Sequence, residues 1–356
     1  TDGGDFGDSY NYGAPAADTV VERPDSVSVS SDLAGPVRAR LTVTRTFPWP
    51  RGVAADGSAR TNETDASELI TQVELRAGEP FARLSVAFEN RSDDHRVRFH
   101  APLPRRAGAS HAEGQFAVVE RGPAGEGGYG EEPLGTYPAH GWVDAGGLAI
   151  LLDHLTEYEL AVEGREIALT VLRSIGLISR NANPYRQDPA GPEMAIPNAQ
   201  MRGGWRLSFG LLPHAGNWAD GGVTDAAERH RHPLIAYPGI AAADAAWPPA
   251  GAGDDALSLE GAQVVLSSLR RRDDGWLEAR IVNLASEPRT ATLRGGLSEA
   301  REATLRGEPG DALDVADGGL HFELRSAEIR TIQLRRRETA RGRAEVLDVS
   351  GPRHST

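Results

Sequence analysis

Apolar and polar residues alternate with a period of two along much of this chain. The clearest case is residues 37–47, Val-Arg-Ala-Arg-Leu-Thr-Val-Thr-Arg-Thr-Phe, where nearly every second side chain is apolar. Because successive side chains of a strand point to opposite faces of a sheet, this pattern predicts an antiparallel strand with one buried face. The pattern is less regular but still predicts strands over residues 69–75, 82–88, 97–101, 116–120, 167–172 and 207–212.

Clusters of Gly, Pro, Asp and Asn separate these segments and predict tight connections. They occupy residues 52–57, 122–130 and 181–191. The apolar run 148–152, Leu-Ala-Ile-Leu-Leu, predicts a buried strand. Many short strands at fairly even spacing indicate an all-β fold with few short helices.

One segment has a helical pattern. Thr224 suits an N-cap, and Asp225 and Glu228 follow it in the first turns. We therefore expect a single helix of about two or three turns. It should end before Pro233 and lie across a sheet edge.

The strand pattern predicts two domains. Residues 1–238 carry the first and larger set of strands. Residues 239–256 are rich in Pro, Ala and Gly without periodicity, which predicts an interdomain linker. Strand patterns resume over residues 257–334 and favour a small β-sandwich, and the charged residues 335–356 predict a flexible tail.

Composition excludes several classes of function. The net charge of −13 argues against a nucleic-acid partner, and no run approaches the ~18–20 apolar residues of a membrane helix. The chain has no Cys, which excludes disulfides and Cys-ligated metal sites. All 38 basic residues are Arg, which excludes a Schiff-base or P-loop lysine. Because the chain begins at Thr1 rather than Met, we expect it to be a piece of a longer protein.

The most concentrated polar segment opens the chain, Asp2-Gly-Gly-Asp-Phe-Gly-Asp-Ser-Tyr-Asn-Tyr12. Its carboxylates could accept hydrogen bonds from sugar hydroxyls, and its rings could stack on a sugar C–H face. A calcium loop or a solvated turn would have a similar composition. Asp2, Asp5 and Asp8 do recur every three residues, but no terminal Glu completes an EF-hand pattern.

Histidines offer two further candidates. Asp94-His95-Arg96 could be a general base with an orienting carboxylate, although a salt-bridged strand end is the interpretation we favour. His230 and His232 are two residues apart, which places them on different faces of a helix. We therefore do not expect these two residues to hold a metal ion.

Several segments together, in order, resemble one family. The resemblance covers most of residues 1–334, and the motifs that carry it are Asp5-x-Gly-Asp-Ser-Tyr-Asn-Tyr12, Asp94-His95-Arg-Val-Arg98, Gly141-Trp-Val-Asp144, Gly147-Leu-Ala149, Glu157-Tyr-Glu159, Leu169-Thr-Val-Leu-Arg-Ser174, Ser179-Arg180, Gly191-Pro-Glu-Met194, Ala199-Gln200, Leu212-Pro-His214, Val264-Val-Leu-Ser-Ser-Leu-Arg270, Asp273-Asp-Gly275 and Asn283. The chain thus resembles the C-terminal half of the retaining, zinc-dependent α-mannosidases of glycoside hydrolase family 38, in their bacterial branch.

The resemblance implies a large β super-sandwich similar to galactose mutarotase, followed by the small β-sandwich. In this family an N-terminal β/α barrel carries the zinc ligands and both catalytic carboxylates. We find no strand–helix alternation for such a barrel here, so we expect no catalytic residue, metal ligand or cofactor in this chain, and zinc only in the parent enzyme.

The resemblance also implies partners and contacts. The expected partners are α-mannosides, the catalytic barrel of the same protein and a possible second copy of the chain, in the bacterial cytoplasm. The chain alone should be inactive, and the barrel-facing surface should be exposed as an apolar patch. The residues that we expect at the sugar are Tyr10, Asp8, Asp5, Arg173, Arg180 and Glu193.

Two alternatives remain open. The chain could be an autonomous super-sandwich enzyme, an epimerase or a lyase, which needs its own acid and base. Candidates for these roles are His95, His140, His154 and His214. Alternatively, it could be a non-catalytic carbohydrate-binding module.

Overall fold

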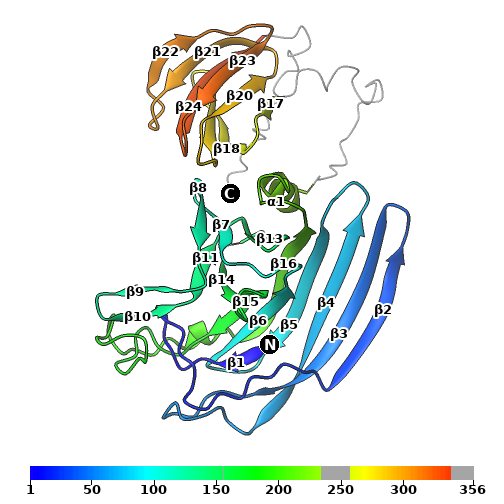
Figure 1. Ribbon diagram of the computed structural model, residues 1–356, viewed down its shortest axis with the longest axis vertical. Helices are drawn as coiled ribbons and strands as arrows, with labels where there is room; N and C mark the ends of the chain where they lie inside the picture. Colours follow the sequence, from blue (N-terminus) through cyan, green and yellow to red (C-terminus); the bar gives the residue numbers. More distant parts are fainter. Residues whose placement is uncertain (155, 234–256, 338–356) are drawn as a thin grey trace, which may run out of the picture. The chain divides into compact units, whose positions relative to one another are not determined.

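A computed structural model of the chain describes residues 1–154, 156–233 and 257–337 (Figure 1). The chain contains two compact units; the described residues up to 233 belong to the first and those from 257 to the second. The predicted linker 239–256 lies outside the described residues, as does the predicted tail from residue 338. Arg335 and Arg336, however, belong to a strand, so the last strand continues past the predicted end of the sandwich.

The first unit is built on a nine-stranded antiparallel sheet. In spatial order, its strands are β2 (Ser26–Ala34), β3 (Arg38–Pro50), β4 (Thr64–Arg76), β5 (Ala82–Asn90), β16 (Gly203–Pro213), β13 (Leu148–Leu152), β12 (Trp142–Ala145), β7 (Ser110–Gly114) and β8 (Ala117–Arg121). The predicted alternation at 37–47 lies in β3, which pairs with β4 along its whole length.

A five-stranded antiparallel sheet forms the second layer of this unit. Its order is β1 (Asp2–Gly4), β6 (His95–Pro102), β15 (Glu166–Ser174), β14 (Thr156–Ala161) and β11 (Thr136–Ala139). Two smaller elements complete the unit, a hairpin of β9 (Glu126–Gly128) and β10 (Glu131–Leu134) and the 3₁₀ turn η1 (Pro197–Gln200). The predicted turn cluster 122–130 therefore contains a strand, β9.

The main core lies between these two sheets. Val86 and Ile150 from the nine-stranded sheet pack in it with Ile167 and Leu169 from the five-stranded sheet. β13 is the buried strand that its apolar sequence predicted, and it is buried on both faces because alternate side chains enter two different cores. These sheets establish the all-β sandwich that the sequence predicted.

Helix α1 (Val223–Arg231) covers the second face of β13. The predicted helix thus exists, but two details of the prediction were wrong. Gly222, in a left-handed conformation with φ 62°, is the N-cap, and Thr224 lies inside the helix. The helix also packs on β12, β13 and β16, which are inner strands of the sheet rather than its edge. Among the described residues, no helix is long and apolar enough to cross a membrane.

The second unit is a small sandwich of two antiparallel sheets. One contains β17 (Ser258–Glu260), β20 (Arg289–Arg294) and β23 (Gly319–Leu324), and the other contains β18 (Val264–Arg271), β19 (Leu277–Asn283), β24 (Ile329–Arg336), β21 (Leu297–Ala303) and β22 (Pro309–Leu313). Ile281 and Ile332 of one sheet pack with Leu293 and Leu324 of the other, so this unit has its own apolar core.

Candidate functional site

The polar segment at the start of the chain forms a tight loop, residues 5–13, which we call the opening loop. It follows β1 and closes on itself, because the Phe6 N–H donates to Gly13 O and the Asp8 N–H donates to Asn11 O. Gly7 is required at the crossing point: a Cβ there would lie 2.0 Å from Asn11 O. The glycines therefore permit a turn that a larger residue would block.

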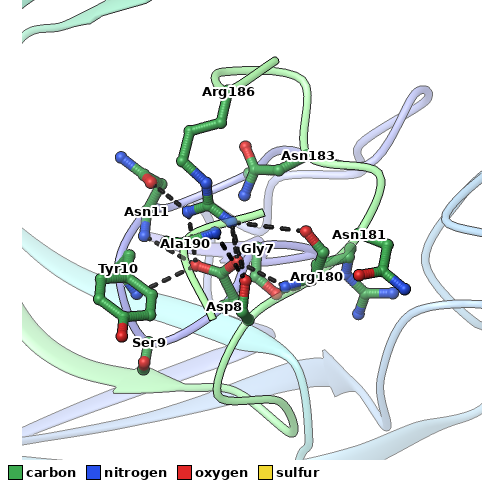
Figure 2. A network of polar contacts seen from close by, with 12 residues as sticks. Gly7, Asp8, Ser9, Tyr10, Asn11, Arg180, Asn181, Asn183, Arg186 and Ala190 are labelled. Carbon is green, nitrogen blue, oxygen red and sulfur yellow. Dashed lines mark hydrogen bonds and ion pairs between the residues drawn. The ribbon is translucent and has the colours of Figure 1, made fainter. Parts of the chain in front are cut away.

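Asp8 lies at the centre of the site and is completely buried. Figure 2 shows it surrounded by donors from the opening loop and from residues 180–190. Its Oδ1 accepts from the backbone N–H groups of Tyr10 and Asn11, each at 3.0 Å, and its Oδ2 accepts from the Arg180 N–H at 2.7 Å. Arg186 donates to both oxygens, at 3.2 and 2.5 Å.

The electrostatics of Asp8 follow from these contacts. Burial acts to raise the pKa of this carboxyl, but the hydrogen bonds from Arg186 and from the backbone of Arg180, Asn11 and Tyr10 outweigh it. Together they lower the pKa of Asp8 to about 2. Asp8 is therefore an ionised anchor at physiological pH.

Asp5 is a second buried anchor, and Arg173 of β15 is its partner. Asp5 Oδ2 accepts from Arg173 Nε at 2.6 Å, and Oδ1 accepts from the N–H groups of Gly7 and Gly13. The same guanidinium donates to the carbonyls of Asp8 and Asn11, at 2.7 and 2.6 Å. Asp5 and Asp8 therefore hold Arg side chains and shape the loop.

The exposed rim of the site carries the remaining predicted residues. Tyr10 is 56% exposed, and the Arg186 guanidinium lies 5.7 Å from its ring centroid. Arg180 stacks on the Phe6 ring at 3.5 Å. Glu193 is exposed, and its Oε2 accepts from the Asn181 N–H at 2.7 Å. The structure thus brings all six predicted residues to one loop and the segments beside it.

Arg186 is a central residue that sequence reasoning missed. It lies in the cluster predicted only as a turn, and nothing in its neighbours distinguishes it from the other Arg residues. The β9–β10 hairpin also joins this region, because the Glu132 N–H donates to Tyr185 O and the Gln187 N–H donates to Gly130 O. Tyr129 is fully exposed at the tip of that hairpin.

His95 lies in the core rather than in an open site. It is completely buried, with Nδ1 2.6 Å from Asp2 Oδ1 and Nε2 2.9 Å from Asn90 Oδ1. Arg60 holds the other Asp2 oxygen at 2.7 Å. This buried network fixes β1 against β6, so His95 is a structural residue at the strand end, which is the interpretation we favoured.

The other histidines are dispersed. His214 is held by Asp144 at 2.7 Å, His154 contacts Asp153, and His140 is exposed after β11. His230, a residue of α1, is buried, whereas His232 at the end of the helix is exposed. Over the described ranges, no group of three or more His, Cys, Asp or Glu residues is arranged to hold a metal ion.

Comparison with known proteins points to one family. No protein-family model matches the chain. It is 28% identical over 169 residues to a protein of Halalkalibacterium halodurans named "Putative mannosylglycerate hydrolase", and 26% identical over 211 residues to human "Alpha-mannosidase 2C1". These matches cover 45% and 58% of the chain but only 17% and 18% of the two relatives.

Two solved structures match nearly the whole chain. One is an α-mannosidase from Enterococcus faecalis V583, with 20% identity and a TM-score of 0.71. The other is a protein in glycosyl hydrolase family 38 from Enterococcus faecalis, with 19% identity and the same TM-score. Each match covers 94% of this chain and 38–39% of the solved chain, and at this identity it establishes the fold.

The relatives confirm the resemblance that the ordered motifs predicted. The chain spans less than a fifth of its curated relatives and about two fifths of the solved structures, which fits one region of a longer enzyme. The chain is therefore similar to the C-terminal region of the α-mannosidases of glycoside hydrolase family 38.

Proposed function

We propose that this chain is the carbohydrate-binding, site-completing C-terminal region of a retaining, zinc-dependent α-mannosidase. The parent enzyme would hydrolyse terminal α-mannosides in the bacterial cytoplasm, with its catalytic groups in a barrel outside this sequence. The observation that carries the proposal is Tyr10, an exposed aromatic ring on a loop whose buried carboxylates are fixed by Arg173 and Arg186. Such a rigid platform loses little entropy when a sugar binds.

The geometry indicates what these residues contribute. An exposed aromatic ring can stack on the C–H face of a sugar, and the Tyr10 hydroxyl can exchange hydrogen bonds with its hydroxyls. The oxygens of Asp5 and Asp8 are already occupied, so both residues act by positioning Tyr10. A fixed sugar reaches the reacting geometry at lower entropic cost.

The chemical step belongs to other groups. A retaining glycosidase needs a nucleophile and an acid/base carboxyl about 5–5.5 Å apart. Zinc in the parent enzyme would bind sugar hydroxyls, but the described residues contain no donor set that fits zinc. We therefore assign neither a catalytic carboxyl nor a zinc-dependent step to this chain.

An apolar surface on the first unit supports a contact with the rest of the parent enzyme. Val29 of β2 pairs with Val43 of β3, which lies in the same cross-strand row as buried Val86 of β5. The core-facing side of the sheet thus continues outward to β2, where Val27 and Val29 are 56% and 62% exposed. We propose that the barrel or a second copy of the chain covers this face.

The experiment compares turnover with binding. The isolated chain, given zinc and an aryl α-mannoside, should show no enzyme-like turnover. Saturation-transfer NMR should detect weak binding of α-mannobiose, lost in Tyr10→Ala and partly retained in Tyr10→Phe. Phe116→Ala is the matched control, because Phe116 is an exposed ring on the β7–β8 turn. Enzyme-like turnover, or mannobiose binding that does not depend on Tyr10, would refute the proposal.

A further inference from the structure

The second unit gathers two identical sequence motifs at one edge of a sheet. Leu-Arg-Arg-Arg occurs at residues 269–272 and again at 334–337, so six of the 38 Arg residues lie in these two runs. The runs end β18 and β24, which both pair antiparallel with β19 between them. The two strands therefore run in the same direction, and their Arg-rich ends meet at the same edge of the sheet.

Three of these Arg residues already have carboxylate partners. Arg270 and Arg272 both bind Glu278, at 2.6 and 2.9 Å, and the Glu278 side chain is only 3% exposed. Burial acts to raise the pKa of Glu278, but hydrogen bonds from Gln333, Arg270 and Arg272 hold that pKa below its usual value. Arg335 lies 3.5 Å from Glu299 and 4.6 Å from the Trp276 ring centroid.

The remaining Arg residues are placed differently. Arg336 Nε donates to Gly295 O at 2.8 Å. The side chains of Arg271 and Arg337 are exposed, and in the part of the chain that the structure describes neither guanidinium has an ion pair or a hydrogen bond. Among the described residues, these two cationic groups are therefore uncompensated, although the net charge of the chain is −13.

A pocket of about 900 Å³ lies at this edge. Its charged lining consists of Arg271, Arg335, Arg336, Arg337, Asp274 and Glu299, four cations against two anions. Both anions are already engaged, because Asp274 lies 3.4 Å from Arg272 and Glu299 pairs with Arg335. The pocket volume is within the range typical of small-molecule sites.

We propose that this pocket binds a small polyvalent oxyanion, such as a phosphorylated or polycarboxylated metabolite or sugar. The planar guanidinium groups of Arg271 and Arg337 bind the anion by charge-assisted, bidentate hydrogen bonds. Leu277 is partly exposed and adds an apolar lining against which a carbon skeleton can pack. The site lies entirely in the second unit and does not depend on the mannoside site of the first.

The test is isothermal titration calorimetry of the whole chain at low ionic strength. Pyrophosphate is the probe for phosphate groups and citrate the probe for carboxylates. The structure predicts saturable binding of at least one probe, weakened about tenfold or more in Arg271→Ala/Arg337→Ala. The probe that binds more tightly shows whether the site prefers phosphate groups or carboxylates. Raising the ionic strength from about 0.05 to about 0.3 M should also weaken binding.

The matched control is Arg306→Ala/Arg325→Ala, which removes the same charge from exposed positions of the same unit outside the pocket. This variant should bind the probes like the parent chain, and an equal loss would show that only overall charge matters and would refute the site. Failure of both probes to bind would also refute it. The proposal would also be refuted if a short single-stranded oligonucleotide bound through Arg271 and Arg337 more tightly than either probe.

Discussion

Arg186 and Asp8 are 178 residues apart in the sequence, yet their guanidinium and carboxylate groups form a two-point contact inside the protein. The two side chains are 4% and 0% exposed. Because a buried charge is stable only with its partner, the opening loop and the segment around Arg186 must fold together. This pair therefore fixes the loop that presents Tyr10.

Replacing Arg186 by Leu should destabilise the first unit strongly. The substitution leaves the Asp8 carboxylate buried without its main charged partner, which typically costs about 3–5 kcal/mol. We expect this loss in the free energy of unfolding measured with urea at pH 7. The loop should also become more sensitive to limited proteolysis.

The matched control for this substitution is Arg202→Leu. Arg202 pairs with Asp93 at 2.5 Å, but its side chain is 58% exposed. Exposed pairs typically contribute about 0–1 kcal/mol, so this variant should unfold almost like the parent chain. Equal losses in the two variants would contradict the importance of burial.

The pKa of Asp8 predicts an acid-dependent loss of stability. Its folded-state pKa of about 2 is below the ordinary value of 3.8, so the unfolded chain binds the proton first as the pH falls. The stabilisation by Asp8 is therefore complete above about pH 4 and is lost toward pH 2. Asp8→Asn should be less stable at pH 7 and should show a flatter loss of stability below pH 4. If urea unfolding showed the same loss of stability below pH 4 in Asp8→Asn and in the parent chain, this assignment would be contradicted.

The sequence predicted those strands in which burial in a core requires a recognisable pattern of apolar residues. β3 has one core face, which favours apolar residues at alternate positions, and β13 has two core faces and an unbroken apolar run. β2 was not predicted: Val27 and Val29 alternate with serines, but the alternation is short and, in this edge strand, every residue except Leu33 is exposed. β12 was also missed, since a strand of four residues is too short to show periodicity.

The candidate site was predictable in its residues but not in its connections. Asp5, Asp8 and Tyr10 stand out in the sequence because a dense polar run with glycines is unusual. Asp5 and Asp8 are paired with Arg173 and Arg186 by contacts between distant segments of the chain, and such contacts cannot be predicted from a local sequence pattern. The N-cap of α1 was misassigned for a local reason: Gly222 can adopt the left-handed conformation that starts the helix before Thr224.

Gly7→Ala should disrupt the opening loop by steric conflict alone. An added Cβ would lie 2.0 Å from Asn11 O and 2.7 Å from Gly13 N, and both atoms belong to the backbone. Overpacking of this kind typically costs about 1–3 kcal/mol, which urea unfolding can measure. The control Gly108→Ala meets no atom within 4 Å and should be neutral or slightly stabilising. A neutral Gly7→Ala would show that the loop can open without loss.

His230 should make the first unit less stable at mildly acidic pH. Burial, with a smaller contribution from the Arg83 charge, lowers the pKa of His230 to about 4. Arg83 Nη1 lies 3.3 Å from Nδ1, and Nε2 is buried with no partner among the described residues. The other charged groups that act on the ring are Asp153, Glu79 and Arg231, and their smaller contributions do not offset the effect of burial. The folded protein therefore has no stabilising site for a second ring proton.

The sign of the effect follows from this lowered pKa. Between about pH 6.5 and pH 4 the unfolded chain binds the proton and the folded chain does not, so stability falls as the pH falls through this window, by about 3 kcal/mol in total. His230→Gln should remove that slope from urea unfolding curves, whereas His232→Gln, with an exposed side chain at the end of the same helix, should keep it. If His230→Gln keeps the slope, the slope does not come from His230. The folded parent chain would then bind a proton on this ring as readily as the unfolded chain does.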